Sequence, residues 1–120
     1  MGLDIYFNKV HRKQVGYFRK VHFLVAFFEK KGFNVDTQAD YYTCREDIEE
    51  LIDICKKVLE NHDLAEELLP TMSGFFFGDT DYNEYYFDDV KEVLEYCEQE
   101  LLPIFEDLDE GEYITFDTWY

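Results

Sequence analysis

The chain has 120 residues, of which 47% are hydrophobic and 19% aromatic, and its formal net charge at pH 7 is −17. This hydrophobic share excludes a disordered chain, and the length is that of one domain, so we expect a single domain over residues 1–120. The negative charge repels nucleic acid and anionic membranes, so we expect neither as a partner and favour a basic protein surface.

The charge is divided between two parts of the chain. Residues 1–31 contain seven Lys or Arg and two acids, whereas residues 32–120 contain four and twenty-six, giving net charges of +5 and −22. Most of the early basic residues lie close together: Lys9, Arg12, Lys13, Arg19 and Lys20. We expect them to face the acidic part of the chain. Exposed ion pairs contribute only about 0–1 kcal/mol each, so such contacts orient elements more than they stabilise them.

The first 33 residues predict a strand followed by a helix. Leu3, Ile5 and Phe7 alternate with polar positions, which indicates a short half-buried strand. Apolar residues then recur at steps of three or four from Val15, which predicts a helix over residues 15–31. Gly32 is expected to end this helix, with Phe33 making the accompanying apolar contact.

A second helix is predicted from a clean apolar stripe in the middle of the chain. The stripe consists of Ile48, Leu51, Ile52, Cys55, Val58 and Leu59. Its start is predicted by a capping box, either Thr43 with Glu46 or Cys44 with Asp47. A brief extended stretch at Tyr41 and Tyr42 precedes it. Asp63 and Glu66 predict a second capping box, followed by a short helix that ends at Pro70.

The C-terminal third predicts an irregular segment, a long helix and a strand. Residues 70–87 follow no regular period, and Asp88 or Asp89 can then cap a helix. The stripe of this helix is Val90, Val93, Leu94, Cys97, Leu101, Ile104 and Phe105. Pro103 should kink the helix or end its regular part. Residues 109–111 predict a turn, and residues 113–120 alternate as a strand does.

These elements predict the α+β class: a helix-rich single domain with three main helices, a short helix, and a small sheet that pairs the N- and C-terminal strands. Two strands alone are marginally stable, so we expect the sheet to pack on a helix or to gain a third strand.

The cysteines and the N-terminus indicate a protein of a reducing cytosol. Cys44, Cys55 and Cys97 are odd in number and form no Cys-x-x-Cys pair, so we expect no disulfide framework. Cys55 and Cys97 fall on apolar stripes and are expected in the core. Residues 1–4 lack a signal-peptide pattern, and no apolar run approaches the ~20 residues of a membrane span.

Few patterns indicate cofactor chemistry, and we expect neither a cofactor nor a bound metal. Asp79, Asp81 and Asn83 resemble the start of an EF-hand loop, but Glu84 and Val90 stand where Gly and Glu are required. A looser magnesium site at Asp79, Asp81, Glu84 or Asp88 stays open. The three histidines lack zinc spacing, and no glycine-rich loop follows a strand to hold phosphates.

Several segments resemble a known family of small uncharacterised proteins from phages, prophages and their bacterial hosts. These segments are Met1–Asp4, Val15–Lys20, Arg45–Leu51, Leu68–Gly78 and Tyr82–Phe87, and the Ser-Gly-Phe-Phe-Phe-Gly run at residues 73–78 is the most specific. The family has no established activity, so no catalytic residue is carried over. The resemblance implies an accessory protein of a mobile element that acts inside a bacterial cell.

The leading hypothesis is a non-enzymatic binder, which could inhibit a host nucleic-acid-binding or defence protein by imitating the phosphate backbone. Acids steer association, and neighbouring aromatic residues supply binding energy. The expected partner-binding residues are Asp79, Asp81, Tyr82, Glu84, Tyr85, Tyr86, Asp88, Asp89, Glu92 and Glu95. One alternative is a homo-oligomeric assembly module that uses Phe75–Phe77, which could instead be a buried plug. Another is a small hydrolase with a carboxylate-held metal.

Overall fold

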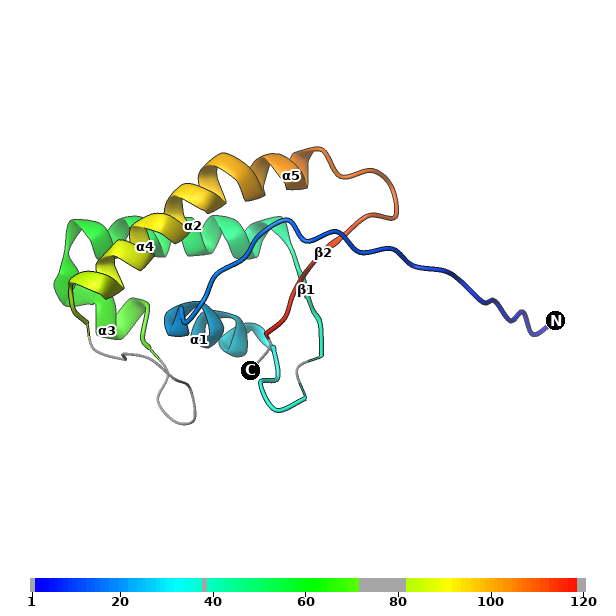
Figure 1. Cartoon of the computed structure of the whole chain (residues 1–120), viewed down its shortest axis with the longest axis horizontal. Helices are drawn as coiled ribbons and strands as arrows, with labels where there is room; N and C mark the ends of the chain where they lie inside the picture. The colour runs from blue at the N-terminus through cyan, green and yellow to red at the C-terminus, as the bar shows by residue number, and fades with distance from the viewer. Residues whose placement is uncertain (1, 38, 72–81, 119–120) are drawn as a thin grey trace.

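The computed structural model describes residues 2–37, 39–71 and 82–118. Its elements in chain order are α1 (His22–Lys31), β1 (Tyr41–Thr43), α2 (Arg45–Glu60), a 3-10 turn (His62–Leu64), α3 (Ala65–Leu68), α4 (Glu84–Tyr96), a π-helical turn (Cys97–Leu101), α5 (Leu102–Glu106) and β2 (Ile114–Phe116). Figure 1 shows α4 and α5 running along α2, with α1 beneath them. The predicted α+β class is confirmed, with three main helices, a short one, and a small sheet.

The sheet pairs an early strand with a late one. β1 and β2 are antiparallel, with Tyr41 opposite Phe116 and Thr43 opposite Ile114. The inward-facing rings of Phe116 and Phe28 stack with their centroids 4.2 Å apart. The brief extended stretch predicted at Tyr41 is therefore confirmed as β1, and β2 lies within the predicted C-terminal strand.

The predicted strand at Leu3–Phe7 is wrong in position. Residues 2–18 form no regular secondary structure, and those before Phe18 are exposed. The alternating pattern is present, but these residues find no strand to pair with, and an edge without a partner cannot form a ladder. We call residues 2–14 the N-terminal arm; in Figure 1 it extends away from the helices.

α1 begins at His22 and not at Val15 as predicted, because two features hold the preceding residues out of a helix. Lys20 has a φ of 59°, in the left-handed region that a helix excludes. The hydroxyl of Tyr96 donates a hydrogen bond of 2.9 Å to the backbone oxygen of Val15. A Cβ at Gly16 would overlap with this hydroxyl, so glycine permits the close approach of the two segments.

The end of α1 follows the prediction. Gly32 has a φ of 122°, and its N–H donates to the carbonyl of Glu29. The N–H of Phe33 donates to the carbonyl of Phe28 at 3.0 Å, which completes the hydrogen-bond pattern of a Schellman motif. Phe33 is buried, so the apolar contact expected there is confirmed.

The second of the two predicted capping boxes starts α2. The N–H of Cys44 donates to the carboxylate of Asp47 at 3.4 Å. Asp47 is buried and also accepts a hydrogen bond of 2.9 Å from the hydroxyl of Tyr41. Burial, and then this hydrogen bond, raise the pKa of Tyr41 to about 12. The predicted stripe faces the core along the whole helix, with Leu59 half-buried at its end.

The short helix after α2 ends before Pro70 as predicted, but its cap differs. The side chain of Asn61 accepts a hydrogen bond of 3.1 Å from the N–H of Asp63. Asp63 is therefore not the cap but a residue inside the first turn, which is 3-10 helical. The carboxamide precedes the predicted cap by two residues and satisfies one of the first free N–H groups, that of Asp63.

α4 continues through the π-helical turn into α5. Val90, Val93, Cys97 and Leu101 are buried, which confirms the predicted stripe. The N–H of Leu102 donates to the carbonyl of Cys97, five residues earlier, as a π-helix requires. Pro103 has no N–H to donate and follows directly, so its predicted interruption of the regular helix is confirmed.

The core lies between α1, α2 and α4. Cys55 and Cys97 are buried, as expected for small core residues, whereas Cys44 is exposed. Phe23, Phe27, Phe28 and Phe33 are buried beside the aliphatic stripes of α2 and α4. Over the described residues, no helix combines the length and the apolar character that are needed to cross a membrane.

Among the described residues, the basic segment forms ion pairs with the acidic part of the chain through one residue, Arg12. Arg12 pairs with Asp40, and lies 3.6 Å from a carboxylate oxygen of Asp117. Asp40 precedes β1 and Asp117 follows β2, so Arg12 holds the base of the N-terminal arm at one end of the sheet. Among the described residues, the other four basic side chains of this segment form no ion pair.

Candidate functional site

The candidate site is the first half of α4, and its cap fixes the position of every side chain in it. The side chain of Asn83 accepts a hydrogen bond of 3.1 Å from the N–H of Tyr86. α4 therefore begins at Glu84, four or five residues before the predicted caps Asp88 and Asp89, which are wrong. The earlier start makes helical a stretch that the sequence predicted as irregular, and so orders its acids on a helix face.

Tyr86 is the buried anchor of the site and not a contact residue. Its side chain is 5% exposed, and its hydroxyl donates a hydrogen bond of 2.6 Å to the backbone oxygen of Leu69. Its ring makes edge contacts with Phe23, Tyr82 and Phe87. Burial raises the pKa of this phenol well above its usual value. Its predicted role in partner binding is therefore wrong, because no partner can reach the ring.

Four acids form one exposed row along α4: Glu84, Asp88, Glu92 and Glu95. Their spacing of four, four and three residues keeps them on one side of a helix with 3.6 residues per turn. We call this row the α4 acidic face. In the described part of the chain, none of the four carboxylates forms an ion pair with a Lys or Arg side chain.

Two tyrosines border the α4 acidic face. Tyr85 is 75% exposed, and Tyr82 is 36% exposed. The hydroxyl of Tyr82 accepts a hydrogen bond of 3.2 Å from the N–H of Thr71, which fixes the end of this ring. Exposed tyrosine beside acids combines apolar contact area with a hydroxyl that can hydrogen bond, as protein-binding surfaces commonly do.

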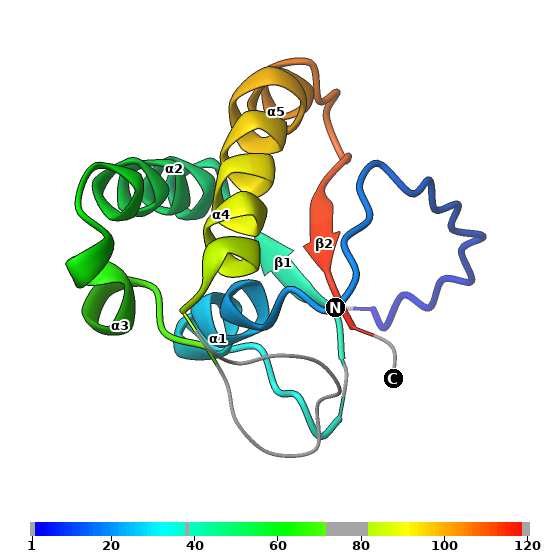
Figure 2. The same ribbon diagram turned by 60° about the vertical axis from the view of Figure 1, so that its left-hand side comes forward.

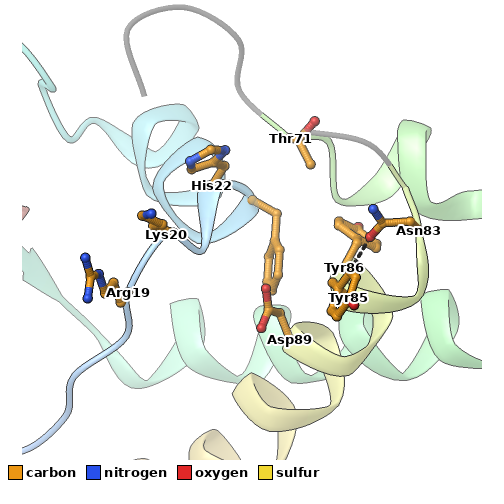
Figure 3. A pocket seen from close by; sticks show the side chains of 9 residues that line it. Arg19, Lys20, His22, Thr71, Asn83, Tyr85, Tyr86 and Asp89 are labelled. Atoms are coloured by element: carbon orange, nitrogen blue, oxygen red, sulfur yellow. Dashed lines mark hydrogen bonds between the residues drawn. The ribbon is translucent and has the colours of Figure 1, made fainter. Parts of the chain in front are cut away.

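Asp89 points away from the acidic face into an open pocket of about 180 Å³. Figure 3 shows Arg19 and Lys20 on one side of this pocket, and Asn83 and Tyr85 on the other. Burial, and then the neighbouring charges of Glu92 and Asp88, raise the pKa of Asp89. Asp89 is half-buried, so it belongs to the pocket wall more than to the partner-binding surface predicted for it.

The charge pattern predicted that Arg19 and Lys20 face the acidic part of the chain, and both line the pocket that Asp89 enters, but the backbone that brings them there was not predicted. Both were expected on a helix over residues 15–31, whereas the positive φ of Lys20 ends an extended segment that leads into α1 beside α4. The predicted helix gave no indication of this turn. The pocket is lined by the basic residues Arg19 and Lys20 as well as by the acid Asp89, so it carries charges of both signs.

The remaining predicted residues of the site, Asp79 and Asp81, lie outside the described residues, as do Phe75–Phe77. Within the described residues, no group of three or more His, Cys, Asp or Glu side chains lies close enough together to hold a metal ion. The open magnesium alternative depends on Asp79 and Asp81 together with Glu84 and Asp88, and so stays a prediction.

Comparisons of the chain with protein-family models, with curated proteins and with solved structures gave no match. Function is therefore inferred from the side chains of the site.

Proposed function

We propose that the chain is a non-enzymatic accessory protein of a phage or another mobile element, and that it binds a basic surface of a host protein in the bacterial cytoplasm. The observation that carries this proposal is the α4 acidic face. Its four carboxylates are exposed and, among the described residues, have no basic partner within the chain. An acidic row that the fold leaves unpaired is available to a partner's Lys and Arg side chains.

The kind of partner follows from the charge. Proteins that bind nucleic acid present Lys and Arg residues that neutralise phosphates, and a row of carboxylates on a rigid helix can occupy such a groove. The net charge of −22 on residues 32–120 would increase the rate of that encounter. The proposed action is therefore inhibition of a host nucleic-acid-binding or defence protein by mimicry of nucleic acid.

Acidic residues alone speed the encounter with a basic partner more than they tighten the complex. The tyrosines that border the α4 acidic face supply the contact area that tight binding requires. Tyr85 is largely exposed at the edge of the face, where a partner can cover its ring. Buried aromatic anchors commonly dominate the binding energy of protein interfaces. Because Tyr86 holds the same helix turn in the core, Tyr85 is presented from a fixed backbone, which lowers the entropy lost on binding.

The test is a pull-down from bacterial host lysate with the wild type and with a variant in which Glu84, Asp88, Glu92 and Glu95 are replaced by their amides. We expect the wild type to retain a basic protein at low salt and to release much of it at high salt, because screening weakens exposed charge pairs. The amide variant should lose the partner, and Tyr85→Ala should weaken binding about tenfold or more.

A matched control removes the same charge elsewhere. Glu46, Glu60, Glu66 and Glu67 are exposed and lie outside α4, and their replacement by Gln changes the net charge by the same amount. This control should keep the partner. Equal loss in both variants would mean that only net charge matters, and failure to capture any basic protein, or capture that salt does not change, would contradict the proposal.

A further inference from the structure

The N-terminal arm has the pattern of a strand but lacks a neighbour. Leu3, Ile5 and Phe7 alternate with polar residues and are 86%, 73% and 97% exposed. Single exposed apolar residues are ordinary, but three at alternate positions form one apolar row when the segment adopts a strand, and water disfavours such a row. The arm also lengthens the molecule: the radius of gyration is 16.4 Å, against about 14 Å for a compact chain of this length.

The sheet has edges that lack a neighbour: it contains only two described strands, so the outer edge of each strand, including that of β2, is without a neighbouring strand. Ile114 and Phe116 face the core, yet both remain half-buried. A two-stranded sheet is marginal in water. A third strand beside β2 would cover these two side chains and pair the free backbone groups of the edge.

The base of the arm determines which sheet it can complete. Arg12 holds it beside Asp40 and Asp117, at the end of the sheet where β2 finishes. From that point the arm could lie along β2 of its own chain only as a parallel neighbour. In Figures 1 and 2 the base of the arm passes close to β2, and the rest of the arm turns outward, away from its own strands. An arm from a second molecule has no such restriction and can pair antiparallel, which is slightly more stable per residue.

We propose that the N-terminal arm pairs antiparallel with the open edge of β2 in a second copy of this chain, and that two copies exchange arms in a symmetric dimer. The register that places Ile5 opposite Phe116 also places Phe7 opposite Ile114, on the same face of the sheet. The apolar row of the arm thereby extends the row of β2, and it covers the half-buried edge of the core.

Charge favours the same register. It places Lys9 opposite Glu112 of the second copy, so a basic residue of the arm meets the acidic connection before β2, while Arg12 keeps its ion pair with Asp40 of its own chain. In the described structure, neither Lys9 nor Glu112 forms an ion pair. A parallel arrangement would instead place the basic end of the arm near Asp117, where Arg12 already lies. Complementary charge at one end and apolar contact along the strand identify a second copy as the partner.

The first experiment measures the oligomeric state by light scattering over a wide range of protein concentration. The full chain should form a dimer, and the double variant Ile5→Asp, Phe7→Asp should be a folded monomer, because both side chains are exposed in the single copy and contribute nothing to its core. The control Tyr17→Asp adds an acid at an exposed position outside the proposed strand and should stay dimeric. A wild type that is monomeric throughout would overturn the proposal.

The second experiment separates exchange between copies from pairing within one chain. In a Cys44→Ser background, Lys9→Cys and Glu112→Cys are made in separate chains, mixed, and treated with a short thiol cross-linker. The mixture should give a covalent dimer in much higher yield than either variant alone. If instead the chain carrying both substitutions closes on itself and the mixture gives no dimer, exchange is wrong. Neither result depends on the α4 acidic face. The dimer proposal and the proposed function can therefore be confirmed or contradicted independently of each other.

Discussion

Two adjacent tyrosines show how one helical step separates a core residue from a surface residue. Tyr85 and Tyr86 are chemically identical, but the start of α4 turns Tyr86 inward and Tyr85 outward. The sequence predicted both as contact residues, because the segment was expected to be irregular. An irregular segment has no regular buried and exposed faces by which the two could be distinguished. The capping side chain of Asn83 sets the helical phase, and only with that phase known can the two be told apart.

Tyr86→Phe should lower the free energy of unfolding by about 1–2 kcal/mol. The substitution removes the donor of the 2.6 Å hydrogen bond and leaves the carbonyl oxygen of Leu69 buried without it, while the packing of the ring is retained. Denaturation by urea measures the change. Tyr85→Phe is the matched control and should alter the free energy by less than about 0.5 kcal/mol. Equal effects of the two substitutions would contradict the assignment of Tyr86 as the anchor.

The buried thiols make the fold sensitive to alkali. Burial raises the pKa of both Cys55 and Cys97 from 9.0 to about 12. Between these values the unfolded chain releases the protons and the folded chain retains them, so stability falls as pH rises. We expect a loss on the order of 1 kcal/mol per pH unit for each thiol between pH 9 and 12, measured by urea denaturation.

The control for this alkaline effect is a chain in which both thiols are removed. Cys55→Ala with Cys97→Ala should give a shallower decline over the same pH range than the wild type. Part of the decline should persist in the double variant, because burial also raises the pKa of Tyr96 from 10.0 to about 12. A slope that does not change would show that the thiols titrate normally.

At the scale of elements, periodicity predicted the faces of the helices well and their starting points poorly. The stripes of α2 and α4 could be read because apolar spacing is local to the helix. The start of α1 could not be predicted in this way, because it depends on the hydrogen bond between Tyr96 and Val15, which are 81 residues apart. The end of α1 could be predicted, because the neighbouring residues Gly32 and Phe33 specify it by themselves. Local determinants were predictable, and long-range ones were not.

The cap of α4 gives the sharpest test between the predicted and the observed start of this helix. Asn83→Ala should destabilise the fold by about 1 kcal/mol, because the N–H of Tyr86 loses its acceptor. Asp88→Ala should have almost no such effect, since Asp88 is an exposed residue inside the helix. Thermal denaturation of both variants measures the difference. Asn83→Asp, which retains an acceptor, should recover most of the stability, and the reverse order of effects would restore the predicted start.

For the whole molecule, the large excess of negative charge is the main electrostatic property. The formal net charge of −17 produces self-repulsion that the few described ion pairs do not remove. Added sodium chloride should therefore raise the melting temperature by a few degrees, because it screens repulsion over distances beyond about 10 Å at 0.1 M.

The variant with Gln at residues 46, 60, 66 and 67 provides the comparison for this salt effect. It has four fewer negative charges, so its melting temperature at low salt should be higher and its response to salt smaller. An equal response of the two proteins would attribute the effect of salt to something other than net charge.

The pairing of β1 with β2 also determines the order in which parts of the fold can form during synthesis. The partners Thr43 and Ile114 are 71 residues apart, so the sheet cannot close until nearly the whole described chain has been synthesised. α1 and α2 are complete well before that, and during the interval Phe28 and Phe33 lack the ring of Phe116 that packs against both. A ribosome-bound chain thus exposes two core aromatics while its helices are already made. Such a surface attracts chaperones or other nascent chains, and the last strand removes it.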